Sequence, residues 1–445
     1  MTATVCQPVR YTSAPVIWFC VLLALTAGNV VAYATDTRPN VVLIMADDSA
    51  VDNYSCYGST YFSTPRIDEL ARNGAKFNHC YSEPVCTSSR VKIMTGRDGY
   101  RNYVRFGTLD RSEMTFGNML QDSGCATAVA GKWQLHGAPN GSLAPDCGFD
   151  SYCLWNYPET ERSRFWNPSI MQNGTLLKTT DQDYGPDLFL KFVTDFIRQH
   201  KDRPFFVYYP MVLVHSPFVR TPDSSDGKAR SLALFRDMTA YADKCVGRLV
   251  DALEENGLRK NTVVIYTTDN GTGRSLTYPF GDEERRGEKA YATEGGTHAP
   301  LIVNCPGLVP AGTVSDDLVD FSDFLPTLAE ITGAALPDVE LDGRSFWPQC
   351  LGRKGNPRKW IRQYYYPKFG PAAEKHGQGV NNREIIWAQN QQYKLYNDNS
   401  FFAVADRNET TLIEPGTGSA DAEASRRLLR AAIDELPPKA AKLDP

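Results

Sequence analysis

Short apolar runs recur along most of the chain, and each has about the length of one strand. We predict buried strands at residues 40–45, 126–130, 205–211, 262–268 and 301–304. Their near-continuous apolar character is typical of strands that are covered on both faces.

Helical stretches lie between these runs. Thr64-Pro65 opens a predicted helix that Gly74 closes, and Ser322-Asp323 opens another that Gly333 closes. Amphipathic periodicity predicts two more helices, at residues 187–199 and 231–255. The alternation of strands and helices predicts an α/β fold with a mostly parallel central sheet that helices cover on both faces.

The pattern changes after about residue 336. Short polar and aromatic runs follow at residues 383–389 and 392–395, and a helical stretch covers 421–436. We expect a smaller C-terminal antiparallel sheet with a helix. The chain shows no internal repeat, which disfavours a solenoid.

The first 34 residues have the character of a secretory signal peptide. Arg10 precedes an apolar run at residues 16–25, and Ala32-Tyr33-Ala34 offers a small-residue cleavage site. An uncleaved membrane anchor is the alternative, but Gly28 and Asn29 interrupt the run. We therefore predict a signal peptide at 1–34, a catalytic domain at 35–335, a C-terminal subdomain at 336–445, and an exported protein, periplasmic or secreted.

Charge and composition narrow the class of partner. The chain has 445 residues, with 47 Lys and Arg against 52 Asp and Glu and a net charge of -5. No long run of one sign suggests a nucleic-acid partner, so an anionic ligand would need a local cluster of cations. The sequence carries no signal for an oligomeric state.

Eleven cysteines are present, and Cys6 and Cys20 would leave with the signal peptide. Nine remain, an odd number, so at least one stays unpaired within a monomer or takes part in other chemistry. Cys147 and Cys153 are close enough in sequence to form a local disulfide, and reduced buried cysteines are the alternative.

Two predicted strands deliver oxygen donors to the same edge of the sheet. Asp47-Asp48 follows the first strand, and Asp269-Asn270 follows the strand at residues 262–268. Ligands in such folds bind beyond the carboxyl ends of the strands, and these hard donors suit Ca²⁺ or Mg²⁺. Either pair alone could also shape a turn or cap a helix.

A cysteine opens another predicted helix. The stretch from Cys86 to Gly96 reads as a loop entering a helix, with Thr87, Ser88, Ser89 and Arg90 in its first turn. A helix N-terminus favours an anion or a thiolate. The alternative is a capped helix that follows a buried cysteine.

Cations and polar donors follow other strands. Lys132 comes directly after the strand at 126–130, with Gln134 and His136 just beyond it, and His215 follows the strand at 205–211. Lys289 precedes Glu294-Gly295-Gly296. Positive groups of this kind hold the oxygens of a tetrahedral anion and offset charge on a leaving group.

Taken in order, these motifs resemble those of the type I sulfatases over roughly residues 40–310. The resemblance rests on Asp47-Asp48, the Cys86 to Arg90 motif, Gly131-Lys132-Trp133, His215, Asp269-Asn270-Gly271 and Lys289. It implies a fold similar to alkaline phosphatase. It also implies that a formylglycine-generating or sulfatase-maturing enzyme oxidises Cys86 to formylglycine.

The resemblance further implies a role for each residue. Ca²⁺, rather than Mg²⁺, would lie between Asp47, Asp48, Asp269, Asn270 and the modified Cys86. Arg90 would hold the modified residue, and Lys132 and Lys289 would bind sulfate oxygens, with Gln134 and His136 as further substrate contacts. His215 would protonate the leaving oxygen.

Three positions depart from the family pattern. Ser88 stands where Pro or Ala is usual, which bears on the maturation system. Gln134 stands where His is usual, and an amide binds sulfate without exchanging a proton. His298 stands where Arg is usual, which is expected to remove a structural ion-pair donor.

These motifs predict a hydrolase of sulfate monoesters. Aromatic and basic residues at 101–111 and 154–166 favour a sulfated carbohydrate as substrate, although the same residues could simply pack the loops. A phosphodiester or phosphonate monoester hydrolase of the same fold is one alternative. A non-catalytic binder of sulfated polymer is another.

Overall fold

The computed structural model describes residues 38–135, 143–155, 163–225, 230–368 and 383–437, together with the first two residues. Residues 36–445 form one compact unit, and residues 1–35 form a unit of their own. The predicted signal peptide lies almost wholly outside the described residues, and its cleavage stays a prediction. So does the division of the chain at residue 336.

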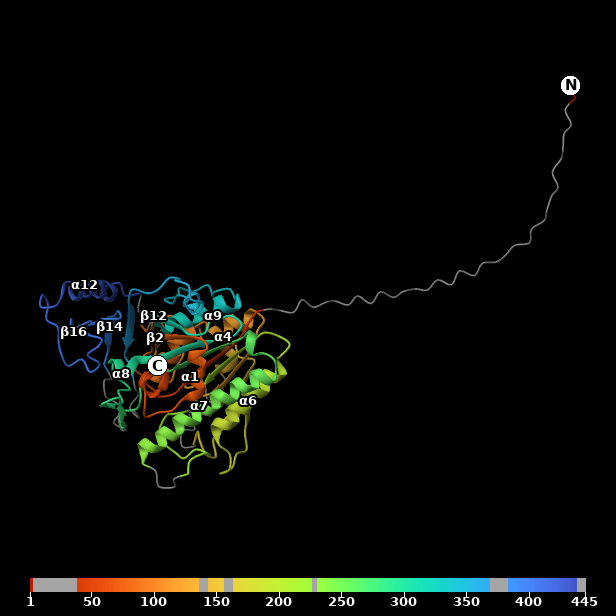
Figure 1. Cartoon of the computed structure of the whole chain (residues 1–445), viewed down its shortest axis with the longest axis horizontal. Coiled ribbons are helices and arrows are strands. Elements are labelled where there is room, and N and C mark those ends of the chain that lie inside the picture. The colour runs from red at the N-terminus through yellow and green to blue at the C-terminus, as the bar shows by residue number, and fades with distance from the viewer. Residues whose placement is uncertain (3–37, 136–142, 156–162, 226–229, 369–382, 438–445) are drawn as a thin grey trace. The chain divides into compact units, whose positions relative to one another are not determined.

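A ten-stranded sheet organises the compact unit (Figure 1). Its strands in spatial order are β12 (Thr313–Asp320), β2 (Ala75–Tyr81), β11 (His298–Asn304), β8 (Thr262–Thr268), β1 (Asn40–Ala46), β7 (Phe205–Pro210), β3 (Ala126–Gly131), β4 (Ser151–Trp155), β5 (Ile170–Gln172) and β6 (Thr175–Leu176). All five strands expected from the apolar runs are present.

The middle of the sheet is parallel. β1 pairs in parallel with β8 on one side and with β7 on the other, and β3 continues the parallel run to β4. β11 lies antiparallel to β8 and to β2, and β5 and β6 form an antiparallel margin. The expectation of a mostly parallel sheet is confirmed, with antiparallel pairs away from its centre.

One face of the sheet packs against α1 (Pro65–Arg72), α6 (Gly185–Gln199) and α7 (Ser231–Glu255), which lie together in Figure 1. Val42 and Ile44 of β1 belong to the same buried cluster as Phe189 of α6 and Phe235 of α7. These helices match the predicted ones, because an apolar stripe at helical spacing must be buried against the sheet.

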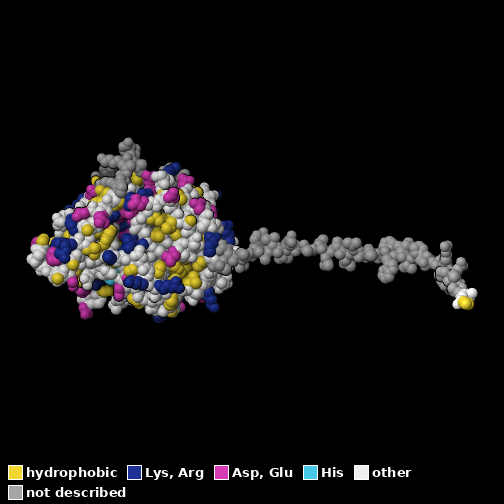
Figure 2. Space-filling model, turned by 90° about the horizontal axis from the view of Figure 1, so that it is seen from above, with side chains coloured by type: hydrophobic (Ala, Val, Ile, Leu, Met, Phe, Trp, Pro, Cys, Tyr) yellow, Lys and Arg dark blue, Asp and Glu magenta, His cyan; other side chains and the backbone are white. Residues whose placement is uncertain are grey.

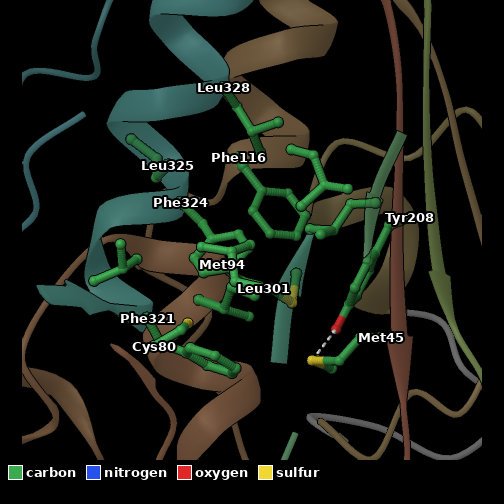
Figure 3. Packing of buried hydrophobic residues seen from close by; sticks show 14 of the residues in the cluster. Met45, Cys80, Met94, Phe116, Tyr208, Leu301, Phe321, Phe324, Leu325 and Leu328 are labelled. Carbon is green, nitrogen blue, oxygen red and sulfur yellow. Dashed lines mark hydrogen bonds between the residues drawn. The ribbon is translucent and has the colours of Figure 1, made fainter. Parts of the chain in front are cut away.

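The other face packs against α2 (Cys86–Thr95), α4 (Phe116–Asp122) and α9 (Phe324–Thr332). The alternate residues of β1, Val41, Leu43 and Met45, belong to this second layer. Figure 3 shows Phe116, Phe324 and Leu328 packed beside Tyr208 of β7, whose hydroxyl donates to the Met45 sulfur at 3.8 Å.

The C-terminal residues add the small antiparallel sheet that was predicted. Its strands are β13 (Ile361–Tyr365), β14 (Ile385–Gln389), β15 (Tyr393–Tyr396) and β16 (Phe401–Ala403), and α12 (Ala420–Asp434) packs on it.

Shorter elements connect these layers. They are η1 (Val51–Asn53), η2 (Ser55–Tyr57), α3 (Gly99–Asn102), α5 (Leu143–Asp146), η4 (Arg259–Asn261), β9 (Thr277–Phe280), β10 (Glu283–Arg286), α8 (Glu294–Thr297), η5 (Phe321–Asp323) and α10 (Trp347–Cys350). In the part of the chain that the structure describes, no helix is long and apolar enough to cross a membrane.

The cysteines resolve one open alternative. Cys147 and Cys153 are both free and buried, and burial raises the pKa of each thiol to about 12. Cys147 lies in the α2 layer and Cys153 in the α7 layer, on opposite sides of the sheet. The local disulfide is therefore wrong, because the sheet separates the two sulfurs.

On the face shown in Figure 2, acidic and basic side chains are interspersed, and neither sign of charge dominates. This agrees with the small net charge of -5.

Candidate active site

Four adjacent parallel strands bring the predicted residues to one edge of the sheet. In the order β8, β1, β7, β3, they are followed by Asp269-Asn270, Asp47-Asp48, His215 and Lys132. Backbone hydrogen bonds fix this edge, because Asp269 N donates to Ala46 O at 3.0 Å and Asp47 N donates to Leu213 O at 2.7 Å. The site lies where an α/β sheet binds its ligands.

Two glycines allow the strand ends to approach closely. Gly131 has a φ of 119°, and a Cβ there would lie 2.0 Å from Pro210 O. Its neighbour Lys132 donates its N–H to that same oxygen at 2.7 Å. A Cβ on Gly271 would lie 1.9 Å from Gly295 O, so both motif glycines are required by backbone contacts.

The first carboxylate pair is held by two lysines. Lys132 Nζ donates to both oxygens of Asp47 at 2.7 and 2.8 Å, and Lys289 Nζ donates to both oxygens of Asp48 at 2.6 and 2.7 Å. Burial raises the pKa of Asp48, but His215, Lys289 and Lys132 together lower it well below its usual value. Asp48 has a φ of 59°, a conformation that the surrounding contacts must maintain.

Arg90 holds the third carboxylate. Its Nη2 donates to Asp269 Oδ2 at 2.8 Å and its Nη1 donates to Lys132 O at 2.7 Å. Burial and Asp47 raise the pKa of Asp269, which Arg90 opposes. Arg90 therefore fixes Asp269 and the Lys132 backbone, and in this structure it makes no hydrogen bond to Cys86.

Asn270 supplies the test of whether a metal fits. Its Nδ2 donates to Asp48 Oδ1 at 2.9 Å, while its Oδ1 is buried and has no hydrogen-bond partner. A buried amide oxygen without a partner is costly unless a ligand uses it. We call Asp47, Asp48, Asp269 and Asn270 the carboxylate cradle, and its hard oxygen donors fit a divalent cation such as Ca²⁺ or Mg²⁺.

Cys86 is the first residue of α2 and only 1% exposed. Burial lowers the pKa of Lys289, while Asp48 and then Cys86 raise it, with a net rise. The cysteine thus lies within electrostatic reach of the lysine that binds Asp48. Ser88 Oγ donates to Val85 O at 3.0 Å, so this unusual residue of the motif serves the helix start.

His215 lies beside the cradle, with Nε2 3.5 Å from Asp48 Oδ2 and Nδ1 2.6 Å from Ser216 O. It forms a candidate metal-binding group with Asp47 and Asp48. Burial first, then Lys289, Arg164 and Lys132, lowers its pKa well below the usual value, and Asp48 opposes the shift.

The remaining predicted contacts differ in outcome. Gln134 is buried with a φ of 55°, and its Oε1 has no hydrogen-bond partner. His136 lies outside the described residues, so its part in substrate binding stays a prediction.

His298 corrects the expectation that an ion-pair donor is missing. Its Nδ1 lies 3.4 Å from Glu294 Oε2, its Nε2 lies 2.8 Å from Asn78 O, and its ring stacks on Tyr81. Burial raises the pKa of Glu294, and the His298 contact helps to lower it below its usual value. The imidazole reaches this acid because Glu294 is the first residue of the short helix α8 and His298, four residues later, follows its last residue.

The loop at residues 101–111 supports the packing alternative. Arg101 pairs with Glu340 at 2.7 Å and with Asp342 at 2.9 Å, and Tyr103 is buried. Those contacts use Arg101 and Tyr103, two of the groups that were expected to bind a sugar, whereas Arg105 and Arg111 are exposed.

The structure also brings in one residue that the motifs did not identify. Arg164 Nη1 lies 3.7 Å from Asp47 Oδ2. Arg164 belongs to the aromatic-rich stretch 154–166, which was noted only for sugar contacts. That richness was the available signal, but nothing in the local sequence indicates that the stretch returns to Asp47.

Comparison with known proteins agrees with this geometry. The family model described as Sulfatase matches residues 39–334, and that described as N-sulphoglucosamine sulphohydrolase, C-terminal, matches residues 283–411. Human arylsulfatase A is 32% identical over 382 residues, covering 78% of this chain and 73% of that protein.

Solved structures share the fold. One, a complex with its substrate D-glucosamine-2-N,6-O-disulfate, has a TM-score of 0.71 at 21% identity, covering 89% of this chain and 97% of that one. Another, a complex with a neocarrahexaose, has a TM-score of 0.70 at 23% identity, covering 89% and 92%. The chain belongs to the sulfatase family and is a sulfuric ester hydrolase.

Proposed function

We propose that this sulfatase is exported and removes sulfate from sulfated carbohydrate, using a formylglycine formed from Cys86 beside a calcium ion. The single observation that carries the proposal is the position of Cys86 as the first residue of α2, the helix whose Arg90 donates to Asp269 of a cradle in which Asn270 Oδ1 has no partner. The formylglycine hydrate would supply the attacking hydroxyl, and bound Ca²⁺ would lower the cost of ionising it.

Asp47, Asp48, Asp269 and Asn270 would hold the calcium ion, with the modified Cys86 beside it. The chemistry of this donor set supports Ca²⁺, which prefers several carboxylate and amide oxygens. A divalent cation would also compensate the carboxylates that Lys132 and Lys289 now compensate. The two ammonium groups would then be able to bind sulfate oxygens.

His215 is proposed to act at the leaving oxygen of the ester. Its ring nitrogens are distinct, because Nδ1 contacts Ser216 O and Nε2 faces the cradle. Burial and the neighbouring cations lower its pKa, and the imidazole must carry a proton when it protonates the leaving group. Gln134 would bind a sulfate oxygen through its amide without carrying a proton.

The likeness to the two structures solved with a sulfated glucosamine and with a neocarrahexaose supports a carbohydrate substrate. Of the aromatic residues at 154–166, Trp155 stacks on Arg164 and Trp166 Nε1 donates to Arg220 O, while residues 156–162 lie outside the described residues. Export rests on the signal-like first 34 residues, and a formylglycine-generating or sulfatase-maturing enzyme would be the partner that modifies Cys86.

The test is sulfate release by protein made in its natural host and supplied with Ca²⁺. We expect hydrolysis of p-nitrophenyl sulfate and faster hydrolysis of 6-O-sulfated glucosamine oligosaccharides. Faster hydrolysis of phenylphosphonate monoesters would favour the phosphonate alternative. Tight sulfate binding without turnover in fully modified protein would favour the non-catalytic binder.

A further inference from the structure

Arg164 has the surroundings of a ligand-binding residue. Its side chain is 13% exposed, and its guanidinium lies 4.0 Å from the ring centroid of Trp155, the last residue of β4. Stacking on an indole orients the planar guanidinium and reduces the entropy it loses on binding. The side chain is therefore held in place before any ligand arrives.

Arg164 makes no hydrogen bond to the carboxylate cradle, whereas the other three cations of the site each make at least one, although Arg90 Nε is also buried without a partner. Nη1 lies 3.7 Å from Asp47 Oδ2, beyond hydrogen-bond distance, and it is buried without a hydrogen-bond partner among the described residues. By contrast, Lys132, Lys289 and Arg90 each donate to a cradle carboxylate at 2.6–2.8 Å. A buried charged donor without a partner is costly unless a ligand satisfies it.

Arg164 approaches the carboxylate cradle through its Nη1 atom. Asp47 Oδ2, its nearest acidic atom, also accepts from Lys132 Nζ at 2.8 Å. Burial lowers the pKa of Arg164, while Asp47, Asp48 and then Cys86 raise it, so these groups lie within electrostatic reach. The Arg164 guanidinium and the Lys132 ammonium group therefore lie beside the same carboxylate, that of Asp47, and Lys132 is the residue proposed to bind sulfate.

If a divalent cation is bound in the carboxylate cradle, the position of Arg164 indicates that an anionic ligand binds next to it. With a +2 ion at Asp47, a guanidinium beside the same carboxylate faces like charge unless an anion lies between them. A sulfate group is such an anion, and its oxygens can accept hydrogen bonds from the planar guanidinium of arginine. A structural arginine such as Arg362 instead uses its donors on Asp98 and on the carbonyls of Ala432 and Glu435.

We infer that Arg164, held against Trp155, is a substrate-binding residue that donates from Nη1 to an oxygen of the sulfate group being hydrolysed, beside Lys132. The inference rests on the proposed function, because it takes the cradle to hold Ca²⁺ and the ligand to be a sulfate ester.

Binding of Ca²⁺ and of inorganic sulfate to the full chain, measured separately by titration calorimetry, tests the inference without turnover. Arg164→Gln is expected to bind Ca²⁺ more tightly than the wild type when sulfate is absent, because a like charge has gone. It is expected to bind sulfate about 10- to 100-fold more weakly in saturating Ca²⁺, the range for losing a charged hydrogen bond. Sulfate should also strengthen Ca²⁺ binding less in the variant, since the coupling is reciprocal.

Matched variants separate binding from folding. Arg236→Gln removes an exposed arginine of α7 that lies over the ring of Tyr61 at 5.5 Å, and it should leave both affinities unchanged. Arg164→Lys keeps the charge without the planar fork and should show an intermediate loss of sulfate affinity. It serves in place of Arg164→Gln if that variant does not fold.

Unchanged sulfate affinity in folded Arg164→Gln would overturn the inference and leave Arg164 as a packing residue. So would a loss confined to a disulfated sugar, which would assign Arg164 to a second anionic group. If the modified wild type binds sulfate through Arg164 but releases none from any sulfate ester, the proposed function fails, and Arg164 is a sulfate-binding residue of a protein without turnover.

Discussion

Two buried charge clusters share helix α2, and they treat their polar atoms differently. Arg90 faces the carboxylate cradle, where Asn270 Oδ1 and Arg164 Nη1 have no hydrogen-bond partner. Two residues later, Lys92 donates to Glu83 at 3.1 Å, Asp320 at 2.8 Å, Arg362 O at 3.3 Å and Gln363 at 2.6 Å. We call this second cluster the Lys92 network.

The contrast shows which cluster serves chemistry and which serves stability. The Lys92 network joins α2 to the C-terminal strand β13 through Gln363 and uses all the donors of its ammonium group. Glu83 Oε2 of the network is also buried without a hydrogen-bond partner, so the two clusters differ in their cations. Lys92 uses all its donors, whereas Arg164 Nη1 beside the cradle has no partner, a cost that a ligand would offset. Changes in the cradle should therefore alter activity and metal binding, and changes in the network should alter the free energy of unfolding.

Cys86→Ala gives the largest expected effect and tests the cradle side. Turnover of a sulfate ester should fall by about 10⁴-fold or more, because the modified residue supplies the nucleophile. The free energy of unfolding should change by about 1 kcal/mol or less. Cys245→Ala, at a buried thiol of α7, is the control and should retain activity. Activity above a tenth of the wild type in Cys86→Ala would contradict the assignment.

Lys92→Met tests the network side. It leaves Glu83 and Asp320 buried without their cation, so the free energy of unfolding should fall by about 3–5 kcal/mol in urea titrations. Ca²⁺ affinity of the folded variant should stay close to the wild type. A loss of Ca²⁺ affinity with no loss of stability would erase the distinction between the two clusters.

Ca²⁺ itself should stabilise the protein through the cradle alone. At a free concentration 100 times the dissociation constant, it should add about 2.7 kcal/mol to the free energy of unfolding. Lys92→Met should gain the same increment, whereas Asn270→Ala should lose most of it. The measurement is thermal unfolding with and without chelator, and an equal gain in both variants would count against the cradle as the metal site.

Glu83→Gln should change how stability depends on pH. Burial raises the pKa of Glu83 from 4.5 to about 8, and Lys92 only partly opposes the shift. The folded state then keeps a proton that the unfolded chain releases, so this contribution is complete below pH 4.5 and is lost as the pH rises through 8.

Wild-type stability relative to Glu83→Gln should therefore fall by about 1–3 kcal/mol between pH 5 and pH 8. Urea titrations of both proteins across this range give the difference directly. A difference that grows with pH would mean that Lys92, rather than burial, controls this carboxyl.

The central strands and the ends that carry the site could be predicted because burial on both faces leaves a continuous apolar run, as in β1 and β8. The outer strands could not be predicted in this way, because they lack a continuous apolar run. β12 is an edge strand that includes Ser315, Asp316 and Asp317, and β2 contains Asn78 and His79, so neither has the apolar run of a central strand. Where side chains face solvent or a loop, the sequence shows no apolar run from which a strand could be predicted.

The site divides along similar lines. Asp47, Asp269 and Lys132 were predictable because parallel strands must end at one edge. Arg164 was not, because no pattern in the local sequence indicates that its side chain lies near Asp47. Likewise, the sequence could not show that Cys147 and Cys153 are unpaired, because this depends on the face of the sheet that each residue occupies.

The most direct test of the account is mass spectrometry of the peptide that carries Cys86, from protein purified in active form from its natural host. The account predicts the mass of the aldehyde or its hydrate at Cys86, with Ser88 unmodified. An unmodified thiol throughout fully active protein would contradict it.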